Sequence, residues 1–144
     1  MSYLCPMWLY NGEPFDELMS AGYEGFVYLI IDDKGKKYIG KKAFSHRNKV
    51  ALSKKARVGT RKRVEIRQKD SGWKNYWGSS KDLLAYIEQT GTENFQRHII
   101  KLCENKQSLS YWEMHHMVLE NVLFSDDYWN GNVLGKFFKG KIHK

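Results

Sequence analysis

The hydrophobic and polar positions between residues 25 and 40 predict a β-hairpin. The run 25–31 (GFVYLII) is dense in β-branched and aromatic residues, and the following 32–35 (DDKG) is typical of a turn. Residues 36–40 (KKYIG) then supply a return strand. The preceding residues 1–24 scatter aromatic side chains among turn formers, so we expect an irregular arm that packs onto the domain.

The first predicted helix begins at Ser79 or Ser80 and ends before Gly91. Serine is a good N-cap residue, an acid at position 82 suits the first turn, and glycine is common just past a helix. The predicted buried side of this helix consists of Leu83, Leu84 and Ile87.

A third strand and a second helix complete the pattern. Alternating apolar positions over 94–103 predict the strand, and the helix starts after Ser108 as its N-cap and runs to about Asn121. Its predicted apolar stripe consists of Leu109, Trp112, His116 and Leu119. The order of elements predicts an α+β fold with a small three-stranded sheet, antiparallel or mixed, flanked by helices.

A chain of 144 residues favours one domain. We expect an N-terminal arm (1–24), a core (25–131) that holds a basic insertion (41–78) after the second strand, and a loose C-terminal tail (132–144). Neither a membrane span nor a secretory signal is apparent, and the two cysteines lack metal-ligand spacing. These features predict an intracellular, cytoplasmic protein without a membrane partner.

The charge of the chain is unevenly distributed. The net charge is +8, but residues 34–74 contain sixteen Lys and Arg against two acids, so this segment carries +14 and the rest carries −6. Such a segment indicates a polyanionic partner such as nucleic acid, although a solvated loop would have the same composition. It lacks the amphipathic period that a membrane-surface helix needs.

Three side chains are candidates for chemistry. Tyr28 and Tyr38 lie on the two strands of the predicted hairpin and become neighbours there, as would any cross-strand aromatic pair. Glu113 lies one helical turn after Leu109 and one before Met117, which places its carboxylate on or beside the apolar stripe. A carboxylate there needs a partner, a metal or a raised pKa, unless it reaches solvent at the boundary.

Taken together, these elements resemble the GIY-YIG nuclease family. Residues 25–28 (GFVY) and 38–40 (YIG) resemble its paired signature, with Val27 where the family has isoleucine. The helix closing on Gly91, the third strand, Glu113 and Asn130 before a glycine follow in the family's order. The resemblance covers about residues 25–131.

The resemblance implies that the protein hydrolyses phosphodiester bonds in DNA with one divalent metal, Mg²⁺ or Mn²⁺, held by Glu113. Tyr28 and Tyr38 would position or deprotonate the attacking water, and Asn130 would orient the site or a phosphate oxygen. The family also has an arginine shortly after its second motif, for which Arg47 is the nearest candidate and Lys41 or Lys42 a substitute. The predicted catalytic set is Tyr28, Tyr38, Lys42, Arg47, Glu113 and Asn130.

The basic segment supplies the predicted DNA contacts. These are Lys41, Lys54, Lys55, Arg57, Arg61, Lys62, Arg63, Arg67, Trp73 and Lys74. The aromatic side chains of 73–77 could stack on bases or cover the core, and the sequence leaves both open. The expected substrate is double-stranded DNA. Whether the protein forms a homodimer stays an open question, because one active site cuts one strand at a time. The family also makes a phage or mobile element a plausible source of the protein. The alternative is a non-catalytic nucleic-acid-binding protein.

Overall fold

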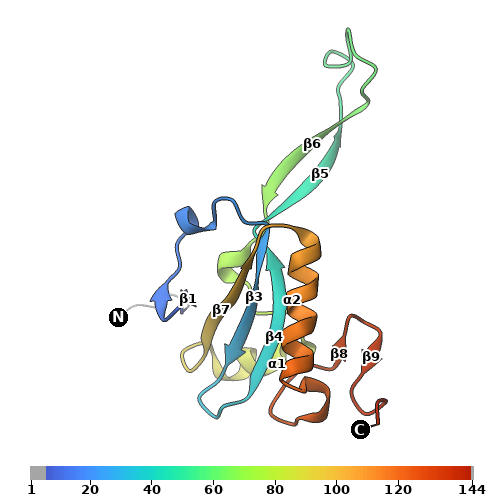
Figure 1. Cartoon of the computed structure of the whole chain (residues 1–144). Helices are drawn as coiled ribbons and strands as arrows, with labels where there is room; N and C mark the ends of the chain where they lie inside the picture. Colours follow the sequence, from blue (N-terminus) through green and yellow to red (C-terminus); the bar gives the residue numbers. More distant parts are fainter. Residues whose placement is uncertain (1–5, 144) are drawn as a thin grey trace.

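A five-stranded mixed sheet forms the centre of the molecule in the computed structural model, which describes residues 6–143 (Figure 1). Strand β3 (Gly25–Ile31) pairs antiparallel with β4 (Lys37–Ala43) on one side and with β7 (Gln96–Cys103) on the other. Strand β1 (Trp8–Tyr10) runs parallel to β7, and β2 (Glu13–Pro14) pairs antiparallel with β1. The predicted hairpin and the third strand are confirmed.

The prediction of a three-stranded sheet was wrong, because the N-terminal segment supplies β1 and β2. The buried indole of Trp8 holds β1 in place: its Nε1 donates to the carbonyl oxygen of Trp73 at 2.8 Å, and its ring packs against Phe26 and Tyr28. Strands of two or three residues have too little alternation to be found from sequence.

Helix α1 (Lys81–Thr90) matches its prediction at both ends. Ser80 is the N-cap, and its Oγ accepts a hydrogen bond from the backbone N–H of Leu83 at 3.3 Å. Gly91 closes the helix with a φ of 78°. Leu83 is fully buried, but Leu84 is 40% exposed and does not belong to the buried side as predicted.

Helix α2 (Lys106–Leu119) starts earlier than predicted. Asn105, rather than Ser108, is its N-cap, and the Asn105 Oδ1 accepts from the Ser108 N–H at 2.8 Å. Leu109 and Met117 are the buried residues of this helix, whereas Leu119 is 61% exposed. Glu113 therefore lies between two buried neighbours, on the face that the helical spacing predicts.

Three short 3₁₀ helices and a small hairpin connect these elements. The 3₁₀ helices are η1 (Glu17–Ser20), η2 (Trp73–Asn75) and η3 (Val122–Phe124), and strands β8 (Asn132–Val133) and β9 (Phe137–Phe138) form the hairpin. The tail is thus attached to the body rather than loose: Val133 is buried, and the Lys139 Nζ donates to the Ser125 carbonyl at 2.6 Å.

Two hydrophobic cores lie on opposite faces of the sheet. Helix α2 covers the face that carries Val27 and Ile39, and the other face packs Tyr28 and Tyr38 against α1, η2 and the aromatic residues of the N-terminal segment. Strand β4 is the edge strand between these layers. Side chains from both layers can therefore meet at its edge.

The middle of the basic segment forms a β-hairpin of its own, which projects beyond the upper end of β4 (Figure 1). We call residues 45–70 the arm: it consists of β5 (Ser45–Ala51), β6 (Val64–Asp70) and the tip between them. The segment 41–78, predicted as a basic insertion, is divided among several parts of the fold. Residues 41–43 belong to β4, and Trp73 and Trp77 are buried in the core. Within the described residues, neither helix is long and apolar enough to cross a membrane.

Candidate active site

Two glycines make room for the tyrosine pair. Gly40 lies directly opposite Tyr28 in the register of β3 and β4, and a Cβ on Gly40 would lie 2.3 Å from the Tyr28 Oη and 2.5 Å from its Cζ. A Cβ on Gly78, whose φ is +91°, would lie 3.0 Å from the Tyr38 Cε1. The glycine of the YIG motif therefore lets the Tyr28 ring lie across β4.

The two tyrosines lie on the same face of the sheet at different depths. Their ring centroids are 6.2 Å apart. The Tyr38 Oη lies 3.1 Å from the Ser79 Oγ in a hydrogen bond, and Tyr38 lines a surface cleft. Tyr28 is 1% exposed and lies behind Tyr38, outside the cleft lining. Tyr38 is therefore the phenol that a bound molecule reaches first.

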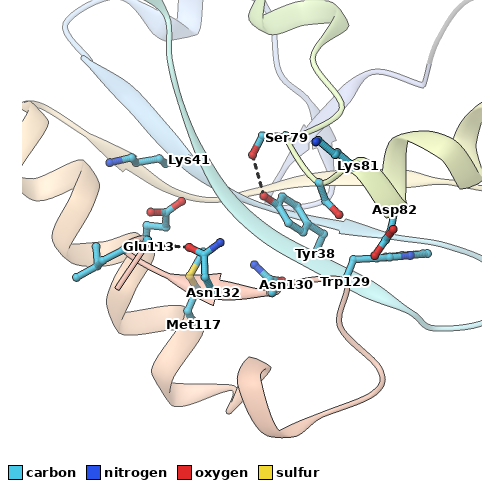
Figure 2. Close-up of a pocket in the computed structure, with 14 residues that line it drawn as sticks. Tyr38, Lys41, Ser79, Lys81, Asp82, Glu113, Met117, Trp129, Asn130 and Asn132 are labelled. Atoms are coloured by element: carbon cyan, nitrogen blue, oxygen red, sulfur yellow. Dashed lines mark hydrogen bonds between the residues drawn. The ribbon is translucent and has the colours of Figure 1, made fainter. Parts of the chain in front are cut away.

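The cleft has a volume of about 580 Å³ and follows the edge of β4 (Figure 2). Tyr38 and Lys41 come from β4, Glu113 comes from α2, and Asn130 precedes β8. Figure 2 shows Glu113 and Lys41 on one side of Tyr38, with Asp82 and Trp129 on the other. Three segments that are distant in sequence thus bring predicted site residues to one cleft.

Glu113 is a half-buried carboxylate at the wall of this cleft. Burial raises its pKa above the ordinary value, and the charge and backbone N–H of Lys41 act in the opposite direction. The Lys41 ammonium donates a hydrogen bond to the Ser110 Oγ at 2.8 Å. A carboxylate whose ionised form is disfavoured by burial gains stability when a cation binds beside it.

The donor set of the cleft fits a magnesium or manganese ion. Among the described residues no three His, Cys, Asp or Glu side chains cluster as metal ligands, and the cleft is lined by two carboxylates, Glu113 and Asp82. Structural zinc sites need four protein ligands. Mg²⁺ instead keeps several waters and binds through one or two carboxylates and substrate phosphates.

Asn130 completes the open edge of β4. Residues 127–129 first run parallel to this strand: the Lys37 N–H donates to the Asp127 carbonyl at 2.8 Å, and the Trp129 N–H donates to the Lys37 carbonyl at 2.9 Å. The Asn130 side chain then replaces the backbone. Its Oδ1 accepts from the Ile39 N–H at 3.0 Å, and its Nδ2 donates to the Ile39 carbonyl at 2.7 Å.

The buried Asn130 amide fixes the part of β4 that carries Tyr38 and Lys41, because its partner Ile39 follows Tyr38 on the strand. Its Oδ1 and one Nδ2 hydrogen are used in that contact. Asn130 is therefore a positioning residue for the two side chains that enter the cleft.

A protein-family model described as "Putative endonuclease segE, GIY-YIG domain" matches residues 8–133. The chain belongs to the GIY-YIG family. The match begins at Trp8, so the family domain includes β1 and β2, which the sequence motifs alone did not reveal. No curated protein and no solved structure matches the chain. Membership of this family indicates a nuclease that acts on DNA.

Burial raises the pKa of both signature tyrosines of this GIY-YIG domain. The pKa of Tyr28 lies well above its ordinary value, mainly because its hydroxyl is desolvated and also because Tyr38 and Tyr76 are close. The pKa of Tyr38 is raised by burial, which its hydrogen bond with Ser79 partly offsets. Both hydroxyls are therefore protonated at neutral pH.

Of the three candidate catalytic cations, Lys41, Lys42 and Arg47, the structure places one in the cleft. Lys41, assigned to DNA contact from sequence, lines the cleft. Lys42 lies outside the lining, with its Nζ 4.2 Å from the centre of the Tyr76 ring. Arg47 is exposed on β5 of the arm, opposite Gln68, and does not line the cleft either.

Apart from Lys41, the predicted DNA-contact residues divide into three groups. The exposed tip of the arm carries Lys54, Lys55, Arg57, Arg61, Lys62 and Arg63. Arg67 pairs with Glu65 within β6, and the Lys74 Nζ lies 2.9 Å from the Glu17 Oε2. Trp73 is 3% exposed and packs edge-on against Phe44 with ring centroids 5.1 Å apart, so it covers the core rather than stacking on bases.

Sequence reasoning missed part of the GIY-YIG cleft. The start of α1 contributes Ser79, Ser80, Lys81 and Asp82 to its lining, and Trp129 forms a further wall. The serine pair was found as a helix cap, and that signal also places the helix N-terminus, although not its proximity to Tyr38. For Trp129, the sequence offers no signal apart from its position beside Asn130.

Proposed function

We propose that this GIY-YIG protein is a metal-dependent DNA endonuclease that hydrolyses phosphodiester bonds in the cleft at the edge of β4. The observation that supports it most is the meeting of Tyr38, Lys41 and Glu113 in one cleft. These residues offer a hydrogen-bonding hydroxyl, a cation and a metal-binding carboxylate, which are the groups that attack on a phosphate needs.

The cleft favours a phosphate over a neutral substrate. Lys41 and Lys81 line it, and α1 begins there with its N-terminal backbone N–H groups. Helix N-termini carry a partial positive charge and free donors, which suit phosphate oxygens. In this proposal the ammonium of Lys41 neutralises charge on the phosphate beside Glu113.

Glu113 holds the divalent cation, Mg²⁺ or Mn²⁺. Such an ion, when bound, stabilises the negative charge that develops on the phosphorus oxygens and on the leaving oxygen. The Glu113 carboxylate would bind the ion from the α2 wall, and the open cleft has room for water and phosphate ligands. The helix neighbours of Glu113, Leu109 and Met117, are buried, which keeps this side of α2 against the sheet.

Tyr38 positions the attacking water. Its hydroxyl is protonated and is held by the Ser79 Oγ, so a lone pair on the Tyr38 Oη remains available to accept a hydrogen bond from water. A phenol with a raised pKa is a weak acceptor for a whole proton, which favours positioning over general-base catalysis. Tyr28 supports Tyr38 from behind, at the ring spacing of 6.2 Å.

The test is incubation of the purified protein with supercoiled plasmid, with Mg²⁺, with Mn²⁺ and with a chelator. We expect nicked or linear product with either ion and intact plasmid with the chelator. Binding to the same plasmid is measured in parallel by gel shift. Binding without cleavage under every metal tested would favour the non-catalytic alternative and contradict the proposal.

A further inference from the structure

The arm stands apart from the rest of the molecule. Strands β5 and β6 pair with each other and with no strand of the main sheet. At the base of the arm, the Ser71 N–H donates to the Phe44 carbonyl at 3.1 Å and the Ser71 Oγ donates to the Ala43 carbonyl. Most of its described side chains are exposed, including those of Val58 and Ile66. Within the described residues, the strands of the arm therefore pack mainly against each other.

The charge of the tip indicates what the arm binds. Residues 52–63 contain six Lys and Arg and no acid. A two-stranded hairpin is marginally stable by itself in water, and six like charges on its tip repel one another. A polyanion would relieve this repulsion and would supply the missing contacts. Because the proposed substrate is DNA, duplex phosphates are the natural partner.

One face of the ribbon suits base edges. Arg47 lies opposite Gln68 in the register, and Ile66 and Val64 follow on the same face towards the tip. Arginine and glutamine make bidentate hydrogen bonds to guanine and adenine, and apolar groups contact the thymine methyl. The other face carries His46, Lys69 and Arg67, the last of which is paired with Glu65, and it has no apolar pair like that of Ile66 and Val64.

The length of the arm sets where on the duplex it would bind. From Tyr38 to Ala43, β4 rises by about 17 Å, and Ser45 to Ala51 adds about 20 Å, at roughly 3.3 Å per residue. The arm continues away from the body beyond the end of β4 (Figure 1). Ala51, where the tip begins, thus lies up to about 37 Å from Tyr38 in the cleft, close to the roughly 34–36 Å of one turn of B-DNA.

We propose that the arm docks as a two-stranded ribbon in the major groove of duplex DNA, about one helical turn from the phosphate in the cleft. This inference rests on the proposed function for its substrate. The major groove is about 12 Å wide and admits a two-stranded ribbon, whereas the minor groove is about half as wide. The basic tip grips phosphates across the groove, and the face with Arg47 and Gln68 lies against the bases.

The first experiment measures binding of a short duplex without metal, in a Glu113→Gln background so that no cleavage occurs. The triple variant Arg61→Gln, Lys62→Gln, Arg63→Gln is compared with the equally charged body variant Lys34→Gln, Lys106→Gln, Lys141→Gln. The plot of log affinity against log salt should become shallower by about 2 to 3 in the arm triple, since each phosphate contact contributes roughly 0.9. The body triple should match the parent. Equal slopes in the two triples would overturn the proposal.

The second experiment tests the groove and the offset. Methyl green, which occupies the major groove, should weaken binding by the parent much more than that by the arm triple, and netropsin in the minor groove should affect both equally. On duplexes shortened stepwise around a mapped cleavage position, parent binding should fall when one side drops below about 10 base pairs, and the arm triple should show no such step. The proposal would be overturned if netropsin displaced the parent and methyl green did not, or if parent binding showed no step as the duplex was shortened.

These results separate the two proposals. Loss of binding in the arm triple of a protein that never cleaves DNA would contradict the proposed function and leave the DNA-docking role of the arm in place. Cleavage by a protein whose arm triple binds as tightly as the body triple would contradict the arm alone.

Discussion

Substitution of Gly40 by alanine tests whether the tyrosine pair depends on the missing side chain at that position. The new Cβ would lie 2.3 Å from the Tyr28 Oη and 2.5 Å from Cζ, distances at which something must move. Tyr28 is 1% exposed and is packed against Trp8 and Phe26, so its ring has no free space to enter. The strain must displace either the ring or β4.

The size of this effect follows from overpacking in other cores. Extra methyl groups in well-packed sites cost about 1–3 kcal/mol of unfolding free energy. For a domain of this size, that loss lowers Tm by roughly 3–10 °C. If the shift of Tyr28 or β4 moves the Tyr38 hydroxyl in the cleft by about 1 Å, the rate can fall by 100-fold. We therefore expect cleavage to fall by far more than stability explains.

The assay compares Gly40→Ala with Gly131→Ala by thermal denaturation and by cleavage of a labelled duplex at saturating protein. A Cβ on Gly131 meets nothing within 4 Å, and Gly131 borders the same cleft, so its variant is a matched control. If Gly40→Ala unfolds and cleaves like Gly131→Ala, the steric account of the YIG glycine is wrong.

Three further predictions concern other residues of the domain. Asn130→Ala leaves the N–H and C=O of Ile39 without partners and should lower the unfolding free energy by about 2–4 kcal/mol in urea titrations, and an unchanged midpoint would exclude this pairing. Because the pKa of Glu113 is raised in the folded state, the unfolding free energy of wild type in a chelator should fall relative to that of Glu113→Gln as the pH rises from below about 4.5 through the folded-state pKa. A free-energy difference between the two proteins that does not change with pH would contradict this. Trp73→Ala should lower the unfolding free energy by about 3–5 kcal/mol, whereas Trp73→Phe should bind DNA as tightly as wild type. A large loss of affinity in Trp73→Phe would instead indicate that Trp73 stacks on bases.

The sequence predicts the hairpin and the helix ends of the site well, because those signals are local. The apolar run of β3, the turn after it and the cap at Ser80 each depend on neighbouring residues. Glu113 was likewise placed beside the apolar stripe by helical spacing alone, and the structure confirms its position between Leu109 and Met117. The resemblance to the GIY-YIG family is confirmed over a longer range than its motifs covered.

Features that depend on distant contacts could not be predicted. Trp8 belongs to a strand because it reaches Trp73, 65 residues away, and the Asn130 amide finds Ile39 across 91 residues. The two strands of the arm were not predicted, since they contain few apolar residues and β5 shows no apolar alternation. Arg47 was nearest to the second motif in sequence, yet the end of β4 carries it onto the arm.

The central claim is that Glu113 serves the chemistry rather than the binding of DNA. The most direct measurement is the single-turnover rate of duplex cleavage with Mg²⁺ by wild type, Glu113→Gln and the control Glu88→Gln, whose side chain is exposed on α1. We expect Glu113→Gln to lose at least 100-fold in rate while it binds the duplex as tightly as wild type, and Glu88→Gln to cleave normally. Equal rates for the two glutamine variants would contradict the account.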